Sequence, residues 1–228
     1  MNKNLSRMLP PILTVLFIAS IILFVISFSI GLPIWGREFY YMQIGPLGLE
    51  EACGRDREVI VAGYDEVLDF LTRPGGSFSA GDFRFSESGA DHFKDCKALF
   101  ALDAIVYIVT ALVISTLLML IRFRKIKLCR PLGFAPSFWS GAITLLGFAT
   151  LGALVLADFD TAFKVFHGIF FPGKDNWLFN PYRDEIILAM PEEFFMNCAL
   201  LIGSSVIILS LVLVLHGIIR KEREKSRS

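Results

Sequence analysis

Two of the three histidines in this chain lie beside long apolar segments. His92 precedes the apolar run 99–121, and His167 follows the apolar run 138–157. A neutral imidazole can accept a proton, and an imidazolium can return it. A titratable pair at the depth of lipid headgroups is therefore suited to general acid–base chemistry on lipid esters, provided that the chain brings the two rings together.

His92 is expected in the first turns of a helix that runs from about Gly89 to Ile121, with Ser88 as its N-cap. The helix dipole disfavours an imidazolium at that end, so the ring should be neutral near pH 7. Asp95 lies on the same helical face as His92 and could orient the ring. The competing interpretation is that His92 only caps the helix or contacts headgroups.

His167 falls in a short aromatic-rich segment that the pattern predicts to be a helix lying in the membrane interface, with Asp160 as its cap. Pro172-Gly173 should end this helix. Alternatively, His167 is an interfacial side chain without chemistry. The third histidine, His216, lies at the far end of the last apolar run and has no predicted role.

The elements that must position these side chains are membrane spans. Hydrophobic residues make up 54% of the 228 residues, and mean hydropathy is +0.61. Four apolar runs each approach the ~20 residues that a helix needs to cross a bilayer, and none shows the alternation of a barrel strand. The sequence therefore predicts an all-α membrane protein in one domain, 1–228, with four transmembrane helices at about 10–32, 99–121, 138–157 and 194–219. The segments 33–98 and 158–193 would form an extracytoplasmic cap of short interfacial helices.

Charge is distributed unevenly between the loops. The N-terminal residues, the loop 122–130 and the C-terminal tail hold twelve basic residues and two glutamates, whereas the segments 33–98 and 158–193 hold ten basic and nineteen acidic residues. The positive-inside rule then puts both termini in the cytoplasm and both histidines outside. The first span is long and has no cleavage site after it, so it is expected to be a retained anchor.

A metal site is a weaker alternative. His92, Asp95, His167 and Glu193 could supply a two-histidine carboxylate zinc site, but no local metal-binding pair such as HExxH supports it, so no metal is predicted. The chain also lacks a glycine-rich phosphate loop and any nucleic-acid footprint.

The four cysteines do not form a framework. Cys53 and Cys96 share the outer side and could form a disulfide, whereas Cys129 is on the inner loop and Cys198 is in the last span.

Two long motifs together resemble a family of small bacterial four-span membrane proteins that includes the lipoprotein intramolecular transacylase. The first motif, F-S-E-S-G-x-x-H-F-x-D-C-K-x-L-F, contains His92. The second, F-H-x-I-F-F-P-G-x-x-x-W-L-F-x-P-x-x-D-x-I-I-x-x-x-P-E-x-F-F, contains His167. The resemblance covers nearly the whole chain in span order. Cys96 stands where the family more often has valine, which argues against a role for its thiol.

The resemblance implies an acyltransferase of the bacterial cell membrane, with diacylated lipoproteins and membrane lipid as partners and no cofactor. The reaction moves the sn-2 acyl chain of a diacylglyceryl-cysteine to the α-amine of the same cysteine. The resemblance also implies that His92 and His167 are the catalytic pair. A metal-dependent lipid hydrolase and a non-enzymatic scaffold protein are the two other functions that the sequence leaves open.

Further side chains are expected to support this pair. Because the ester oxygen gains negative charge during attack, it needs a hydrogen-bond donor, which Tyr182, Arg183 or the second histidine could supply. The supporting residues are predicted to be Asp95, Tyr182, Arg183 and Glu193, and the substrate-lining residues Phe166, Phe170, Phe171, Trp177 and Phe179.

Overall fold

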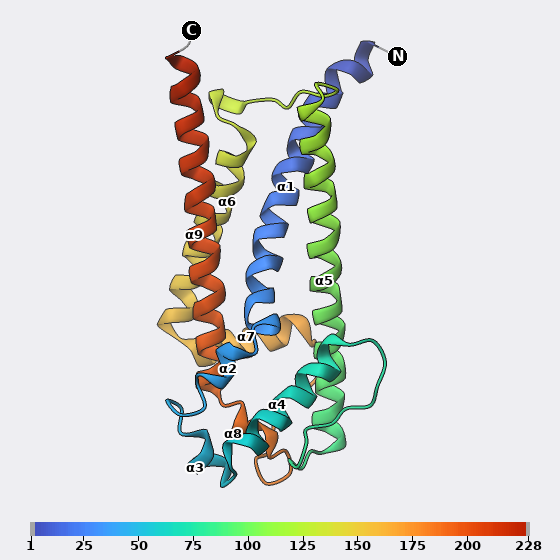
Figure 1. The fold of residues 1–228 in the computed structure, drawn as a ribbon, viewed down its shortest axis with the longest axis vertical. Coiled ribbons are helices and arrows are strands. Elements are labelled where there is room, and N and C mark those ends of the chain that lie inside the picture. The colour runs from blue at the N-terminus through green and yellow to red at the C-terminus, as the bar shows by residue number, and fades with distance from the viewer. Residues whose placement is uncertain (1–2, 227–228) are drawn as a thin grey trace. The chain divides into compact units, whose positions relative to one another are not determined.

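Four long helices dominate the computed structural model, which describes residues 3–226 (Figure 1). They are α1 (Lys3–Trp35), α5 (Glu87–Arg122), α6 (Pro136–Ala157) and α9 (Glu192–Lys225). All four are long and apolar enough to cross a membrane. The predicted four spans are therefore confirmed. Three of the helices continue well past their apolar runs. In α9 the residues after the run are Arg, Lys and Glu, which are good helix formers.

The chain divides into two compact units. One, the membrane unit, takes in the residues up to Ser29, Ala104–Ala153, and the residues from Gly203 onward. The other, the site unit, takes in Ile30–Asp103 and Leu154–Ile202. The expectation that the chain is a single domain stays a prediction.

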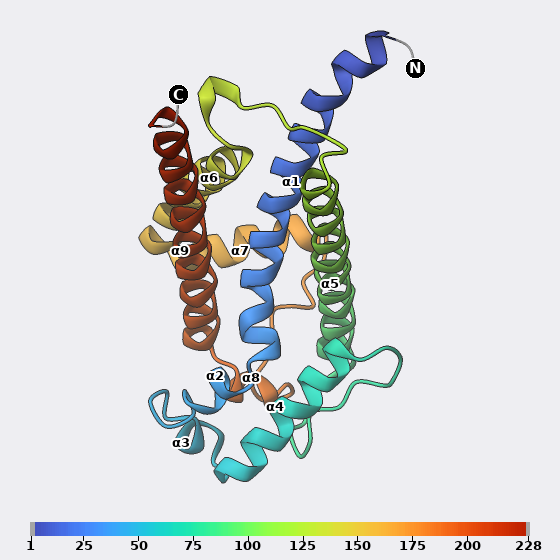
Figure 2. The same cartoon turned by 45° about the horizontal axis from the view of Figure 1, so that its top comes forward.

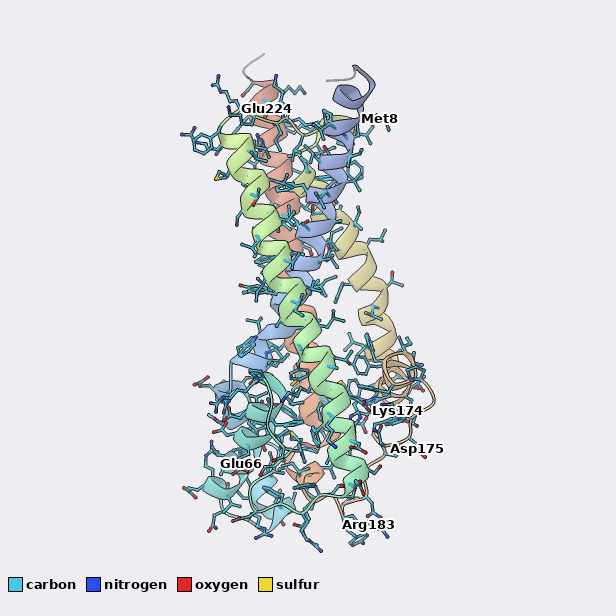
Figure 3. The ribbon with its side chains drawn as sticks, turned by 90° about the vertical axis from the view of Figure 1, so that its right-hand side faces the viewer. Met8, Glu66, Lys174, Asp175, Arg183 and Glu224 are labelled. Atoms are coloured by element: carbon cyan, nitrogen blue, oxygen red, sulfur yellow. The ribbon has the colours of Figure 1, made fainter. Side chains whose placement is uncertain are left out.

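Helices α1 and α5 lie side by side in the membrane unit (Figures 1 and 2), where the rings of Phe24 and Tyr107 stack with centroids 5.2 Å apart. Ser29 on α1 hydrogen-bonds Ser205 on α9 through their hydroxyls, 3.1 Å apart. Helix α1 begins and α9 ends at the same end of this unit, as the labels of Met8 and Glu224 in Figure 3 also show.

Helices α6 and α9 approach each other closely at two glycines. A Cβ on Gly141 would lie 2.5 Å from the Ser210 carbonyl oxygen, and one on Gly217 would lie 2.5 Å from the Cβ of Phe138. Real Cβ atoms do not come this close to other atoms, so these helices can pack only because both positions lack a side chain. Small residues at such contacts are typical of helix pairs in membranes, where close backbone approach supplies the packing energy.

The site unit is built from short helices around an aromatic core. Tyr40 stacks on Tyr64 with ring centroids 3.7 Å apart, and its hydroxyl donates to the Ala189 carbonyl at 2.7 Å. Figures 1 and 2 label the short helices, which are α2 (Glu38–Tyr41), α3 (Leu49–Cys53), α4 (Arg57–Thr72), α7 (Phe159–Phe170) and α8 (Ile186–Ala189). Residues of α2, α3, α4 and α8 contribute to this core, whereas no described residue of α7 does.

The long loop after α4 forms no strand. Between residues 3 and 226 the structure contains only one isolated bridge, from Ala80 to Asp82. All four cysteines are free, so Cys53 and Cys96 do not form the disulfide that the sequence left open.

Candidate active site

The N-terminus of α5 is held by Asp184, which comes from the second sequence segment of the site unit. The buried carboxylate of Asp184 accepts hydrogen bonds from both the backbone N–H and the hydroxyl of Ser86, each at 2.8 Å. The Ser86 hydroxyl oxygen in turn accepts from the backbone N–H of Gly89 at 3.0 Å. Ser86 is therefore the capping residue, and the prediction of Ser88 was wrong by two positions, because the cap is set by the tertiary contact with Asp184.

Gly89 is required where Asp184 meets α5. A Cβ at this position would lie 2.5 Å from the Asp184 carboxylate and 3.0 Å from the ring of Phe179. The glycine of the first sequence motif thus makes room for the aspartate of the second motif. This contact holds the first turn of α5 against the loop that carries Asp184, and His92 lies in the next turn of the same helix.

Helix α7 presents His167. Its N-cap is Asp158, whose carboxylate accepts from the backbone N–H of Thr161 at 3.0 Å. The predicted cap, Asp160, is two residues too late and pairs instead with Lys164. His167 then lies in the last turn of the helix and is buried.

The two imidazoles lie together in the site unit. Their ring centroids are 5.6 Å apart, and each residue is only 5% exposed. The ring of Phe171 contacts both, at 4.9 Å from His92 and 5.7 Å from His167. The chain therefore brings two histidines, 75 positions apart in sequence, into one buried aromatic cluster.

The tautomer of His167 follows from its backbone contact. Its Nδ1 lies 2.7 Å from the Phe163 carbonyl oxygen, which can only accept a hydrogen bond. Nδ1 must carry the hydrogen, so Nε2 of the neutral ring has a free lone pair. Burial lowers the pKa of His167, an effect that the hydrogen bond to Phe163 only partly opposes. His167 is thus a neutral ring with a basic Nε2.

Aromatic side chains surround both rings. Trp177 stacks on His167 at 4.4 Å, and Phe163, which sequence reasoning did not single out, lies 4.2 Å from it. Of the other predicted lining residues, Phe166 contacts His167 at 5.4 Å, Phe179 contacts His92 at 5.5 Å, and Phe170 reaches the cluster only through Phe166 at 4.7 Å.

Asp95 is engaged by two side chains from the loop after α7. The Lys174 ammonium donates to one carboxylate oxygen at 2.6 Å, and the Asn176 amide donates to the other at 3.1 Å. Figure 3 shows Lys174 in this loop beside Asp175. Neither Lys174 nor Asn176 was predicted, because nothing in the spacing of either motif links this loop to Asp95.

Three other predicted supporting residues lie at the surface. Tyr182 is 85% exposed, and Arg183 and Glu193 are exposed as well. No contact described for residues 3–226 joins any of the three to either imidazole. Their roles stay predictions.

The donor set of the alternative metal site does not converge. Among the described residues, no group of three or more histidine, cysteine, aspartate or glutamate side chains is arranged to hold a metal ion. Asp95 is occupied by Lys174 and Asn176, and Glu193 points to solvent. The Sγ of Cys96 lies 3.3 Å from Nε2 of His92, one helical turn along α5.

Four helices long and apolar enough to cross a membrane, together with a buried imidazole pair, fit an integral-membrane enzyme. The family model described as lipoprotein intramolecular transacylase Lit matches residues 15–195, and this chain belongs to that family. The chain is therefore an acyltransferase by family, as the resemblance of its motifs predicted.

Solved structures show the same fold. The lipoprotein intramolecular transacylase Lit from Bacillus cereus aligns with a TM-score of 0.82 at 23% identity, covering 95% of this chain and 97% of that one. A histidine-to-arginine variant of the Bacillus cereus protein aligns with a TM-score of 0.79 at 20% identity, covering 99% and 97%. A histidine-to-alanine variant aligns with a TM-score of 0.78 at 22% identity, covering 98% and 100%. No match was found among the curated proteins.

Proposed function

We propose that this protein moves the sn-2 acyl chain of a diacylglyceryl-cysteine lipoprotein to the α-amine of the same cysteine, with His92 and His167 as the catalytic pair. Family membership supports the reaction class. The observation that carries the assignment of residues is the pair of buried imidazoles with centroids 5.6 Å apart. The product would be an N-acyl, S-monoacylglyceryl lipoprotein.

The proton balance of this reaction suits two imidazoles. An α-amine has a pKa of about 7.7–8.0, so much of it is protonated at neutral pH and must first lose one proton. It loses a second proton as the C–N bond forms, and the departing sn-2 oxygen takes up one proton as the C–O bond breaks. His167 is the base that takes the proton from the attacking nitrogen, because its Nε2 lone pair is free. His92 takes up the first proton of the ammonium and gives one proton to the departing sn-2 oxygen, so one proton is released overall.

Most of the acceleration beyond proton transfer would come from positioning. The amine and the ester belong to one molecule, so holding them in contact replaces an encounter between two molecules. The rings of Phe166, Phe170, Phe171, Trp177 and Phe179 would line the acyl chain and exclude water. Tyr182 or Arg183 would donate to the oxyanion after a movement toward the substrate, and Glu193 would support the entrance of the site.

We also propose that this site faces outward from the bacterial cytoplasmic membrane, with both termini inside. The support is the excess of basic residues in the terminal segments and in the loop 122–130. Diacylated lipoproteins in the outer leaflet would then reach the histidines directly.

The test uses a host whose lipoproteins remain in the diacylglyceryl form. Expression of the wild-type chain should convert their N-terminal peptides to the N-acyl lyso form, detected by mass spectrometry. His167→Asn keeps a donor for the Phe163 carbonyl but removes Nε2, and His92→Asn removes the partner base. Each should slow conversion by ~10²–10⁴-fold, as expected for loss of general acid–base catalysis.

His216→Asn is the matched control. Among the described residues, the side-chain hydrogen-bonding contact given for His216 is with Ser137, through Nδ1 at 3.1 Å. His216 belongs to the membrane unit, so the variant should convert lipoproteins at the wild-type rate. Wild-type activity in both His92→Asn and His167→Asn would refute the assignment of the pair. Unchanged lipoproteins with the wild-type chain at normal expression would refute the reaction itself.

A further inference from the structure

The amide of Asn176 has a fixed orientation. Asp95 has two carboxylate oxygens, and both act as acceptors, one for Lys174 at 2.6 Å and the other for the amide nitrogen of Asn176 at 3.1 Å. A carboxylate cannot donate to an amide oxygen, so the amide nitrogen must be the end that faces Asp95. The amide oxygen of Asn176 is therefore turned away from Asp95.

This oxygen and one nitrogen of His92 are buried without a hydrogen-bond partner. Only three buried side-chain nitrogen or oxygen atoms lack a partner in the described part of the chain: Asn176 Oδ1, His92 Nδ1 and Ser210 Oγ. The first two belong to adjacent side chains. Asn176 binds Asp95, which lies one turn after His92 on α5, and its amide is close enough to the His92 ring to act on it as a hydrogen-bonding group, although the two atoms do not meet hydrogen-bond geometry. A buried unpaired polar atom costs about 1–3 kcal/mol, so two adjacent ones, an acceptor and a nitrogen able to donate, are expected to pair.

We propose that Asn176 is a positioning residue, whose Oδ1 accepts a hydrogen bond from Nδ1–H of His92 and so fixes that ring in the tautomer with a basic Nε2. The chain of interactions runs from Lys174 through Asp95 and Asn176 to His92. This inference rests on the proposed function only for its consequence in catalysis, because the tautomer is a property of the free protein.

The consequence is that both imidazoles present the same atom as a base. His167 is held in the Nδ1–H form by the Phe163 carbonyl, and His92 is held in that form by Asn176. When Nε2 of His92 takes up a proton, the new positive charge faces the amide oxygen, with the Asp95 carboxylate behind it. The other charged or titratable groups that act on His92 are His167 and Lys174, and Cys96 lies against its Nε2. Each ring can then take one of the two protons that the substrate ammonium must lose.

The experiment is nitrogen NMR of the full chain in detergent micelles or nanodiscs, with ¹⁵N-labelled histidine. Three histidines give few signals, and His92→Asn identifies those of His92. The wild-type spectrum should show His92 with hydrogen on Nδ1. Asn176→Leu removes the acceptor at similar volume, and should move His92 toward the Nε2–H form. It should also lower kcat by about 10²-fold with little change in KM, the lower end of a general acid–base effect.

Asn176→Asp keeps an acceptor oxygen toward His92 and should retain the Nδ1–H form, with a proton shared between its carboxyl and Asp95 in place of the amide donor. Asp95→Asn frees the amide to rotate and should give a mixture of tautomers, which provides a second readout if Asn176→Leu does not fold. Asn197→Leu is the matched control, because its amide donates to Gln43 instead, at 2.7 Å, and it should leave the His92 signals unchanged.

The proposal is overturned if folded Asn176→Leu and Asp95→Asn both keep His92 in the wild-type tautomer, or if His92 carries its hydrogen on Nε2 in the wild-type protein. The spectra need no substrate, so the two proposals can fail separately. If the wild-type chain has no transacylase activity but Asn176→Leu changes the His92 tautomer, the proposed function is refuted and the role of Asn176 stands. If the wild-type chain is active but the variants leave the tautomer unchanged, the role of Asn176 is refuted and the proposed function stands.

Discussion

The tautomers of His167 and His92 depend on different kinds of group. The Phe163 carbonyl that fixes His167 is backbone and is present whatever residue stands at position 163. The group proposed to fix His92 is a side chain, Asn176, which a single substitution removes. The tautomer of His167 should therefore survive substitution of Phe163, whereas the tautomer of His92 should change when Asn176 is substituted.

The pH profile should report the buried state of His167. Burial lowers its pKa, so the folded ring stays neutral as pH falls through about 6.5, the ordinary value for histidine. The acid limb of kcat/KM reports the free enzyme's base together with the α-amine of the free substrate, whose pKa is about 7.7–8.0. Rates measured from pH 5 to 8 with a synthetic diacylglyceryl-cysteine peptide, whose α-amine is titrated separately, should leave an enzyme ionisation below pH 6.5. An enzyme ionisation above pH 6.5 would contradict the buried neutral state of His167.

Replacing Cys96 tests whether its thiol takes part. The Sγ atom touches Nε2 of His92 at 3.3 Å, but no step of the proposed mechanism uses sulfur. Cys96→Val is close in volume and should retain at least about half of the wild-type kcat/KM, since volume-conserving changes are the best tolerated. A loss of tenfold or more in a variant with an unchanged melting temperature would show that the thiol assists His92.

At this scale the sequence predicted the residues with distinctive chemistry and missed those that act through packing. His92, His167 and most of the aromatic cluster could be identified because their motifs are long and specific. Asn176 and Asp184 could not, since an amide or a carboxylate in a loop has many ordinary uses. Their importance depends on which backbone or side-chain atoms lie opposite them in the folded chain.

Among the elements, α5 depends most on a distant part of the chain. Its first turn is capped by Asp184 from the loop before α8, and Gly89 lets that carboxylate approach. The same loop region supplies Phe179 to the His92 ring. One segment thus both starts the helix that carries His92 and covers its imidazole.

Adding one methyl group at Gly89 should disrupt this arrangement. In Gly89→Ala the Cβ would lie 2.5 Å from the Asp184 carboxylate, so the loop must shift, at a cost of about 1–3 kcal/mol for overpacking. The melting temperature in detergent and the transacylation rate should both fall. Gly147→Ala in α6, where a Cβ meets nothing within 4 Å, is the control and should be neutral or slightly stabilising. Equal behaviour of the two variants would contradict the role assigned to Gly89.

The elements themselves were predictable in proportion to their length. The four spans follow from hydrophobic patterns within one segment, and their positions were right. The caps of α5 and α7 were misplaced by two residues each, because two serines stand at the start of α5 and two aspartates at the start of α7, and only the fold selects between them. Helices α2, α3 and α8 have four or five residues each, too few to produce a periodic pattern.

For the whole molecule, the proposed orientation has a direct test. The twelve basic residues in the terminal segments and the loop 122–130 should hold these parts in the cytoplasm. Green fluorescent protein fused after the C-terminus should therefore fluoresce, and alkaline phosphatase fused at the same place should be inactive. Alkaline phosphatase inserted at Gly75-Gly76, in the loop after α4, should be active. The opposite pattern would place the histidines inside the cell.

The two glycines at the contact of α6 with α9, Gly141 and Gly217, should tolerate substitution far less than the rest of these helices. The outward-facing apolar residues of the same helices can be exchanged for others of similar hydropathy, since lipid tails adapt to their shape. Gly141 and Gly217 have no such latitude, because even the smallest side chain would collide with the partner helix. In a saturation screen read out only by membrane abundance, these two positions should therefore be recognisable without any assay of enzymatic turnover.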